Sequence, residues 1–221
     1  MEDGTRTGLT RQTIIERALG LLDEVGLEGL TVRRIAAELG VKSPALYWHF
    51  RNKQELLDGM AEVVLIGDGV TGPQQGEPWQ EWLANRARAR RRSLLAHRDG
   101  ARLVVNARLG PASTRLFDAT LAALVAHGFT PVLAGRTLMT LSHFIDGVVL
   151  QAQTQRHEAD DTPGAALVAL AGLLDGGMAA PLVVALREGG DPLGEEAFEH
   201  GLRVLIDGTA AALERHREDG R

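Results

Sequence analysis

The sequence predicts an all-α protein with a small N-terminal helix-turn-helix domain, residues 1–66, and a larger helical domain, residues 67–221. Apolar residues recur at helical spacing along nearly the whole chain, and no segment shows the alternation of a half-buried strand. Residues 31–57 have the caps and the glycine turn of a helix-turn-helix unit. The glycine- and proline-rich run GDGVTGPQQGEP, residues 67–78, then breaks the helical pattern, so we place the domain boundary there.

The first helix is predicted from near Thr10 to just before Gly26, and it should pack behind the helix-turn-helix unit. Its apolar residues share one helical face: Ile14, Ile15, Ala18, Leu19, Leu22 and Val25. A glycine directly after the last of these residues is a stop signal for a helix.

The first helix of the helix-turn-helix unit should begin after Thr31, whose hydroxyl can accept from an unpaired N–H of the opening turn. Its apolar face is formed by Val32, Ile35, Ala36 and Leu39. Gly40 is expected to end this helix in the left-handed conformation.

The second helix of the unit is predicted to be very short, from Pro44 to about Phe50. Ser43 followed by Pro44 is a start signal, because a hydroxyl can cap the helix and a proline fits its first position. Asn52 with Glu55 three residues later is a capping-box pattern, which opens a third helix that continues towards residue 66.

Positive charge and aromatic side chains gather in this stretch. Residues 31–53 have a net charge of +4, although the whole chain has −5, because five cations oppose only Glu38: Arg33, Arg34, Lys42, Arg51 and Lys53. The short second helix also carries Tyr47 and Trp48, which it cannot both bury. An ordinary helical hairpin with a solvated charged face would explain the turn, but the cations and aromatic residues favour a helix that enters the DNA major groove.

The candidate DNA-binding residues follow from this arrangement. Those expected to approach base edges and thymine methyl groups are Ser43, Pro44, Ala45 and Tyr47. Those expected mainly at phosphates are Lys42, His49, Arg51 and Lys53, with Thr31 and Arg33 on the preceding helix. Trp48 is the last of the candidate DNA-binding residues.

The run LTVRRIAAELGVKSPALYWHFRNKQELLDGMA, residues 30–61, resembles the DNA-binding domain of the TetR family of bacterial repressors. Further segments resemble the tetracycline repressor branch: EPWQEWL (77–83), HRDGARLV (97–104), HGF (127–129), SHFIDGVVLQAQ (142–153) and EEAFEHGLRVLIDG (195–208). The resemblance implies an all-helical homodimer that binds a double-stranded operator. It also implies that a small molecule bound to the C-terminal domain releases the DNA.

The larger domain should contain several more helices. Their expected bounds are Trp79 to about Ala96, Ala101 to Arg108, Thr114 to Ala126, Pro131 to about Gln155, Pro181 to Glu188, and Leu193 to Glu218. Gly110 and Pro111 should interrupt the helical pattern. The polar run HEADDTP, residues 157–163, is expected to be a linker, and residues 164–180 are expected to form a weak, glycine-rich helix. The last helix has a wide apolar stripe that resembles the family's dimer interface: Phe198, Leu202, Leu205, Ile206 and Leu213.

By the resemblance, one face of the helix from Trp79 lines a ligand tunnel, and that face carries Trp82, Arg86 and Arg90. The other candidate ligand-binding residues are Val104, Asn106, Phe117, Leu121, Leu138, Ser142 and Gln151. Such a set suits an apolar cavity with a few polar groups. Two ordinary roles stay open: the arginines can pair with acidic neighbours on a solvated face, and the apolar residues can be plain core.

Departures from the tetracycline repressors argue against a metal. The positions that hold the drug and its magnesium in those proteins correspond here to the Asp68/Gly69 loop, Arg86, Arg90, Val104 and Gln151. Val104 and the neutral Gln151 offer no charged oxygen to a hard dication. We therefore expect no metal site, no cofactor, and a bulky, partly aromatic effector such as a polyketide-type antibiotic or its precursor. The regulated target is expected to be an export or biosynthetic gene.

Several other classes of protein are excluded or disfavoured. The chain has no cysteine, so disulfides and zinc–thiolate sites are excluded. No apolar run approaches the ~18 residues of a membrane span, and the first ten residues are polar. We therefore expect no membrane partner, no signal peptide and a cytoplasmic location.

An enzyme is not expected either, because nucleophile-elbow, phosphate-loop and zinc-protease motifs are absent. His97 with Asp99, and His157 with Glu158 and Asp160, could form acid–base groups, but they fall near helix ends or in a polar linker. One alternative remains open: a DNA-binding regulator without an effector, whose C-terminal half only dimerises.

Overall fold

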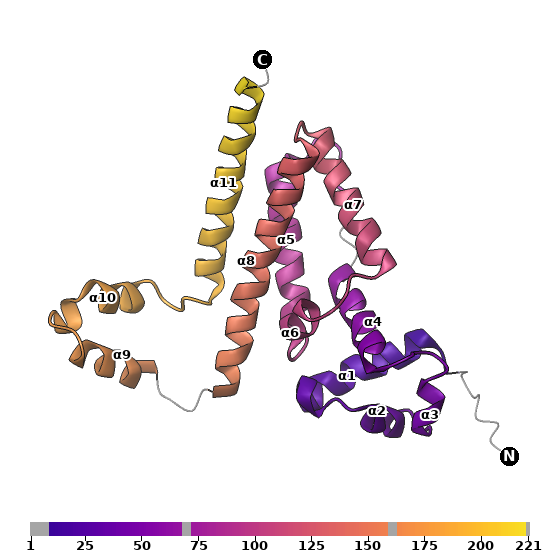
Figure 1. The fold of residues 1–221 in the computed structure, drawn as a ribbon. Coiled ribbons are helices and arrows are strands. Elements are labelled where there is room, and N and C mark those ends of the chain that lie inside the picture. The colour runs from indigo at the N-terminus through magenta and orange to yellow at the C-terminus, as the bar shows by residue number, and fades with distance from the viewer. Residues whose placement is uncertain (1–8, 68–71, 159–162, 220–221) are drawn as a thin grey trace. The chain divides into compact units, whose positions relative to one another are not determined.

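The structure is a computed structural model that describes residues 9–67, 72–158 and 163–219. In these residues all regular structure is helical, which confirms the predicted all-α class (Figure 1). The α-helices are α1 Arg11–Gly29, α2 Val32–Glu38, α3 Ser43–Leu46, α4 Lys53–Ile66, α5 Trp79–Leu95, α6 Gly100–Val105, α7 Pro111–Ala126, α8 Pro131–Glu158, α9 Pro163–Gly172, α10 Pro181–Glu188 and α11 Glu195–Asp219; η1 Gly177–Ala179 is a 3₁₀ turn. Within the described ranges, none of these helices is both long and apolar enough to cross a bilayer.

Backbone contacts divide the chain into two compact units. The first unit comprises Met1–Thr71 and Ala89–Thr120, and the second comprises Gly72–Arg88 and Leu121–Arg221. Helices α5 and α7 therefore contribute residues to both units.

In the first unit, α1 packs against α2 and α4, and α4 packs against α6. The predicted apolar face of α1 is buried apart from the half-buried Val25. Gly26 does interrupt the helix, because its φ of +69° and ψ of 174° are not helical, but helical hydrogen bonding resumes as far as Gly29. The first helix thus ends slightly later than predicted.

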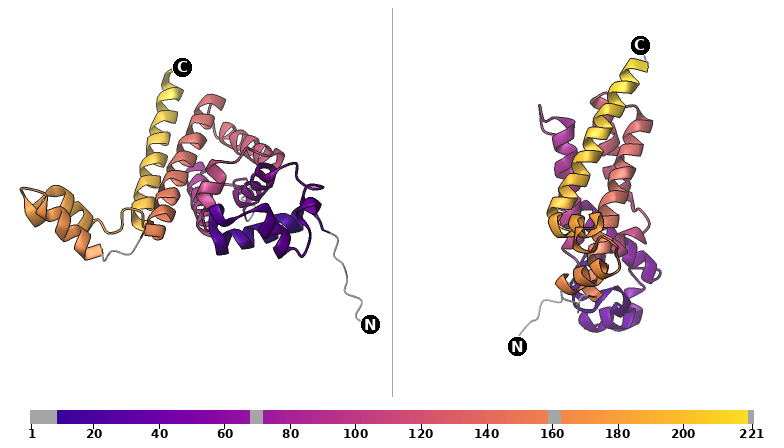
Figure 2. Two further views of the ribbon diagram at one scale, coloured as in Figure 1. Left: turned by 60° about the horizontal axis from the view of Figure 1, so that its bottom comes forward. Right: turned by 90° about the vertical axis from the view of Figure 1, so that its left-hand side faces the viewer.

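In the second unit, α8 and α11 lie side by side and run in opposite directions (Figure 2). The rings of Phe144 and Phe198 stack between them, with centroids 5.5 Å apart and an interplanar angle of 15°. Arg88 on α5 donates two hydrogen bonds of 2.7 Å to the carboxylate of Glu199 on α11. The hydrogen bonds to this carboxylate raise the pKa of the Arg88 guanidinium, so the pair stays ionised.

Several predicted bounds were wrong. Helix α7 begins at Pro111 and not at Thr114, because a proline suits the first turn of a helix and because Glu62 caps that turn. Helix α6 ends at Val105, earlier than Arg108, and α8 continues to Glu158. The glycine-rich segment 164–180 forms the short α9 and the turn η1, while residues 159–162 of the predicted linker lie outside the described residues.

Candidate DNA-binding and effector sites

The helix-turn-helix unit forms largely as its sequence signals predict. The Thr31 hydroxyl caps α2 by accepting from the N–H of Arg34 at 3.2 Å, and Gly40 has the expected positive φ of 65°. The Asn52 side chain caps α4 by accepting from the N–H of Glu55 at 2.9 Å. The Glu55 carboxylate returns the contact by accepting from the N–H of Arg51 at 2.8 Å.

Helix α3, the predicted reading helix, differs from the prediction at both ends. Ser43 is already helical and does not cap; Lys42 occupies the N-cap position without a side-chain hydrogen bond. The helix ends at Leu46, because the next N–H groups form tighter bonds, from Tyr47 to the Pro44 oxygen and from His49 to the Leu46 oxygen. This tighter turn accompanies the burial of Phe50, which is 3% exposed.

The candidate DNA-binding residues lie mostly at the surface. Tyr47 is 55% exposed and Trp48 is 88% exposed, so neither ring is part of the core. The exposed members of the set also include Thr31, Arg33, Lys42, Pro44 and Arg51, and the half-buried members are Ser43, Ala45, His49 and Lys53. Two large aromatic side chains left exposed next to each other, directly after a short helix, are typical of a binding surface.

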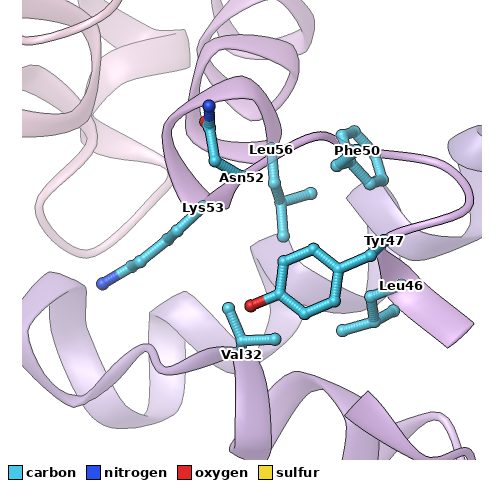
Figure 3. A pocket seen from close by; sticks show the side chains of 7 residues that line it. All are labelled: Val32, Leu46, Tyr47, Phe50, Asn52, Lys53 and Leu56. Carbon is cyan, nitrogen blue, oxygen red and sulfur yellow. The ribbon is translucent and has the colours of Figure 1, made fainter. Parts of the chain in front are cut away.

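A small open hollow lies beside α3. Figure 3 shows its lining, which comes from α2, α3, the following turn and the start of α4: Val32, Leu46, Tyr47, Phe50, Asn52, Lys53 and Leu56. The Tyr47 ring lies over Val32, and its hydroxyl points to the side on which Lys53 extends. The hollow therefore brings a candidate base-reading residue and a candidate phosphate-binding residue together.

A polar face of α4, defined by Gln54, Asp58 and Glu62, holds the segment that joins α6 to α7. The residues are one helical turn apart and therefore share a face. Asp58 accepts from the N–H of Arg108 at 3.1 Å, and Gln54 donates to the oxygen of Asn106 at 3.4 Å.

Glu62 completes this contact at the start of α7. Its carboxylate accepts from the N–H groups of Ala112 at 2.8 Å and of Ser113 at 3.1 Å. Because these N–H groups have no partner within their own helix, a carboxylate is favourable there. A Cβ atom at Gly110 would overlap the Glu62 carboxylate, so this position fits a residue without a side chain. Sequence reasoning missed this cap, because its partners are 50 residues away.

Of the two groups considered and disfavoured as acid–base sites, the one at His97 and Asp99 makes structural contacts. His97 lies 3.1 Å from the carboxylate of Asp23, while Asp99 accepts from the N–H of Leu27 at 2.8 Å. His97 and Asp99 therefore fix the start of α6 to the end of α1. The side chains of His157, Glu158 and Asp160 lie outside the described residues.

The candidate ligand-binding residues divide between the two units and differ in burial. Those in the second unit are Trp82, Arg86, Leu121, Leu138, Ser142 and Gln151, and those in the first are Arg90, Val104, Asn106 and Phe117. Trp82, Leu138 and Val104 are buried, Asn106 and Gln151 are exposed, and the others are half-buried. Asn106 donates to the oxygen of Arg102 at 2.8 Å, so its amide is turned towards its own helix. The Asp68/Gly69 loop lies outside the described residues.

Two arginines near the candidate ligand-binding residues, but not among them, pair with acidic side chains. Arg88 pairs with Glu199, as described above, and Arg102 pairs with Glu28 at 3.1 Å. In the described part of the chain, no group of three or more histidine, aspartate or glutamate side chains is arranged to hold a metal ion.

The capped α2, the Gly40 turn and the short α3, followed by the exposed Tyr47 and Trp48 and flanked by the cations Lys42 and Arg51, define a helix-turn-helix DNA-binding protein. Comparisons with known proteins specify the family. Residues 14–60 match the family described as "Bacterial regulatory proteins, tetR family", and residues 72–213 match "Tetracyclin repressor-like, C-terminal domain". The chain belongs to this family, so it is a ligand-responsive, dimeric, DNA-binding repressor and not an enzyme.

Individual relatives agree over most of the chain. The tetracycline repressor protein class A from transposon 1721 of Escherichia coli is 40% identical over 206 residues, 92% of each chain. The structure of TetR(class A) in complex with 5a,6-anhydrotetracycline and magnesium has a TM-score of 0.70 and 37% identity, covering 92% of this chain and 99% of that one. The TetR family protein ActR of Streptomyces coelicolor, in complex with actinorhodin, has a TM-score of 0.78 and 32% identity, covering 94% and 99%.

Proposed function

We propose that this repressor reads a palindromic operator with α3 and the turn after it. In this proposal the residues at the base edges are Ser43, Pro44, Ala45 and Tyr47. The residues at the phosphates are Thr31, Arg33, Lys42, His49, Arg51 and Lys53, and Trp48 packs along the sugar–phosphate backbone. The observation that carries this assignment is the exposure of Tyr47 and Trp48 directly after α3, with Lys42 before and Arg51 and Lys53 after them in the chain, while Leu46 and Phe50 are buried.

Lys53→Ala tests the phosphate assignment. Removing one phosphate contact should weaken binding to every duplex sequence and reduce the slope of log K against log salt by about one unit. Arg115→Ala, an exposed cation on α7, is the matched control and should leave the slope unchanged. Lys53 is not a phosphate contact if its substitution leaves both the affinity and the slope unchanged.

The operator should be palindromic, because a two-fold dimer presents two reading helices to half-sites about 34 Å apart or a multiple of that. We propose that α8 and α11 form the dimer interface. Their pairing in the chain still leaves Met139 and Val204 about half exposed, at 46% and 56%, and these side chains suit a partner's apolar face. Functionally, residues 1–66 read DNA, and residues 67–221 bind the effector and dimerise. A repressor that binds bacterial DNA must reach it, so we also place the protein in the cytoplasm.

The effector is proposed to be a bulky, partly aromatic metabolite that binds without magnesium. In the second unit, Trp82 and Leu138 offer buried apolar surface, and the half-buried Arg86 and Ser142 offer polar groups for orientation. The buried Val104 and the uncharged Gln151 do not suit a hard dication. A polyketide-type antibiotic or its precursor fits this chemistry, with an export or biosynthetic gene as the regulated target. The related ActR, which was solved with actinorhodin, supports the compound class.

A thermal-shift screen tests the effector class. Aromatic polyketides and tetracyclines are compared on the purified dimer, each with magnesium and with a chelator. A ligand that binds only the folded state raises the melting temperature. The proposal expects hits among the aromatic polyketides with no dependence on magnesium. Absence of any hit among the aromatic polyketides would contradict the proposed effector class.

A further inference from the structure

Helix α3 has only four residues, so it needs contacts outside itself to fix its direction. Its N-cap residue Lys42 makes no side-chain cap, and the residues after Leu46 leave the helical path. Base readout needs side chains placed within hydrogen-bond reach of particular base edges. The groups that hold the end of this turn therefore matter for operator recognition.

Arg11, the first residue of α1, holds the end of the turn. Its guanidinium donates to the backbone oxygen of His49 at 2.9 Å and lies 4.3 Å from the centre of the Phe50 ring. The Arg11 side chain thus binds the His49 carbonyl of the turn proposed to face DNA, and it also covers the buried Phe50 ring. Arg11 lies 38 residues before His49, so no local pattern in the sequence indicates the contact.

Glu55 links Arg11 and the same turn to α4. One carboxylate oxygen accepts from Arg11 at 2.9 Å, and the other accepts from the N–H of Arg51 at 2.8 Å. The N–H of Arg51 and the Arg11 side chain hold the pKa of Glu55 below its ordinary value, so the carboxylate is ionised at neutral pH. The turn from His49 to Arg51 is therefore fixed to both α1 and α4.

We propose that Arg11, held by Glu55, is a positioning residue for operator recognition. It sets the direction of α3 through the His49 carbonyl and does not contact DNA itself. This inference rests on the proposed reading role of α3. The ion pair is partly exposed, with side chains 47% and 33% accessible, and such pairs contribute little to stability. The effect of Arg11 on recognition should thus exceed its effect on folding.

The test compares specific with non-specific DNA binding by the full-length dimer. The specific probe is a duplex selected by the wild-type protein from random sequences, and the other probe is a random duplex. Arg11→Ala should weaken binding to the selected duplex by about tenfold or more, which is the loss of about one base contact. It should change binding to the random duplex by less than about twofold and leave the salt slope unchanged. Arg17→Ala, an exposed arginine on the same helix, is the matched control and should change neither.

Glu55→Gln separates positioning from electrostatics. It removes a negative charge near the DNA, so a purely electrostatic effect would tighten binding to both duplexes. Positioning predicts the opposite for the selected duplex, because a neutral amide holds Arg11 less firmly. Arg11→Lys keeps a donor for the His49 oxygen and should recover part of the lost affinity. A melting curve measured by circular dichroism accompanies each variant. If Arg11→Ala does not fold, the binding of Arg11→Lys and Glu55→Gln to the two duplexes tests the positioning role of Arg11.

Two results would overturn the role of Arg11 while leaving the proposed function intact. One is that Arg11→Ala discriminates between the duplexes as well as the wild type. The other is that it lowers the salt slope by about one unit, which would make Arg11 a phosphate contact. If the wild-type protein selects no duplex at all, the proposed function fails and the role of Arg11 fails with it.

Discussion

The helix-turn-helix unit and the α8–α11 pair both bury apolar side chains, but they differ in the contacts that accompany this core. In the reading unit, polar side chains bind backbone groups of turns and helix ends, as Thr31, Asn52 and Glu62 do. In the α8–α11 pair, stacked rings of Phe144 and Phe198 fill the space between two long helices. Hydrogen bonds from side chains to backbone groups fix the direction of a helix but add little stability. Apolar packing between long helices adds stability but does not fix one helix direction. A protein that must aim a short helix at DNA needs such hydrogen bonds.

The largest effect on stability is expected from Phe198→Ala. This ring is 1% exposed, and its removal leaves a cavity beside Phe144, so the free energy of unfolding should fall by about 3–5 kcal/mol. Phe198→Leu keeps most of the volume and should cost less than about 1.5 kcal/mol. Urea denaturation at one fixed protein concentration measures both, because the stability of a dimer depends on concentration. A loss below about 1 kcal/mol for Phe198→Ala would contradict packing as the source of stability in this pair.

A smaller loss is expected from Gly110→Ala, which pushes the Glu62 carboxylate away from the start of α7. Two N–H groups then lose their acceptor, and the cost should be about 1–3 kcal/mol. In a Glu62→Ala background the same change should cost almost nothing, because the overlapping carboxylate is gone. Gly20→Ala, with open space around the new methyl group, is the control and should stabilise α1 by about 0.5–1 kcal/mol. Additive costs of the Gly110 and Glu62 substitutions would show that the two residues do not interact.

The smallest loss of stability is expected from removing a helix cap, and two similar caps, at Thr10 and Thr31, allow effects on folding to be separated from effects on DNA recognition. Thr10 caps α1 by accepting from the N–H of Thr13 at 3.1 Å, and Thr31 caps α2 in the same way. Thr10→Ala and Thr31→Ala should each cost about 1 kcal/mol of stability. Thr31→Ala should weaken binding to selected and random duplexes alike, because Thr31 belongs to the proposed phosphate contacts. Thr10 caps the turn that carries Arg11, so any effect of Thr10→Ala should be confined to the selected duplex. Equal affinities of the two variants for the random duplex would remove Thr31 from the site.

The same contrast explains how much the sequence could predict. Caps and turns involve residues within a few positions of each other, so Thr31, Gly40 and Asn52 were identified correctly. Ser43 was misread because local rules do not decide which of two adjacent residues starts a helix before a proline.

Contacts between distant segments were not predicted. Arg11 and Glu62 act on backbone groups that are brought near only by folding, and no spacing in the sequence marks such partners. The contact of Glu55 with the N–H of Arg51 is local, but its ion pair with Arg11 spans 44 residues and was also missed. The effector residues were carried over from a family resemblance, and their burial ranges from the buried Trp82 to the exposed Gln151. Selectivity for a ligand depends on how side chains from several helices pack, which a pattern of apolar residues does not specify.

Operator release tests the central claim most directly. A fluorescent duplex selected by the wild-type dimer is titrated with aromatic polyketides and with tetracycline, each with magnesium and with a chelator, and anisotropy reports the bound DNA. The ligand must bind the DNA-free form better for release to occur, and the coupling should be on the order of 1–3 kcal/mol or more. We predict release by an aromatic polyketide to the same extent with the chelator as with magnesium. Release by tetracycline alone, and only with magnesium, would contradict the assignment based on Val104 and Gln151.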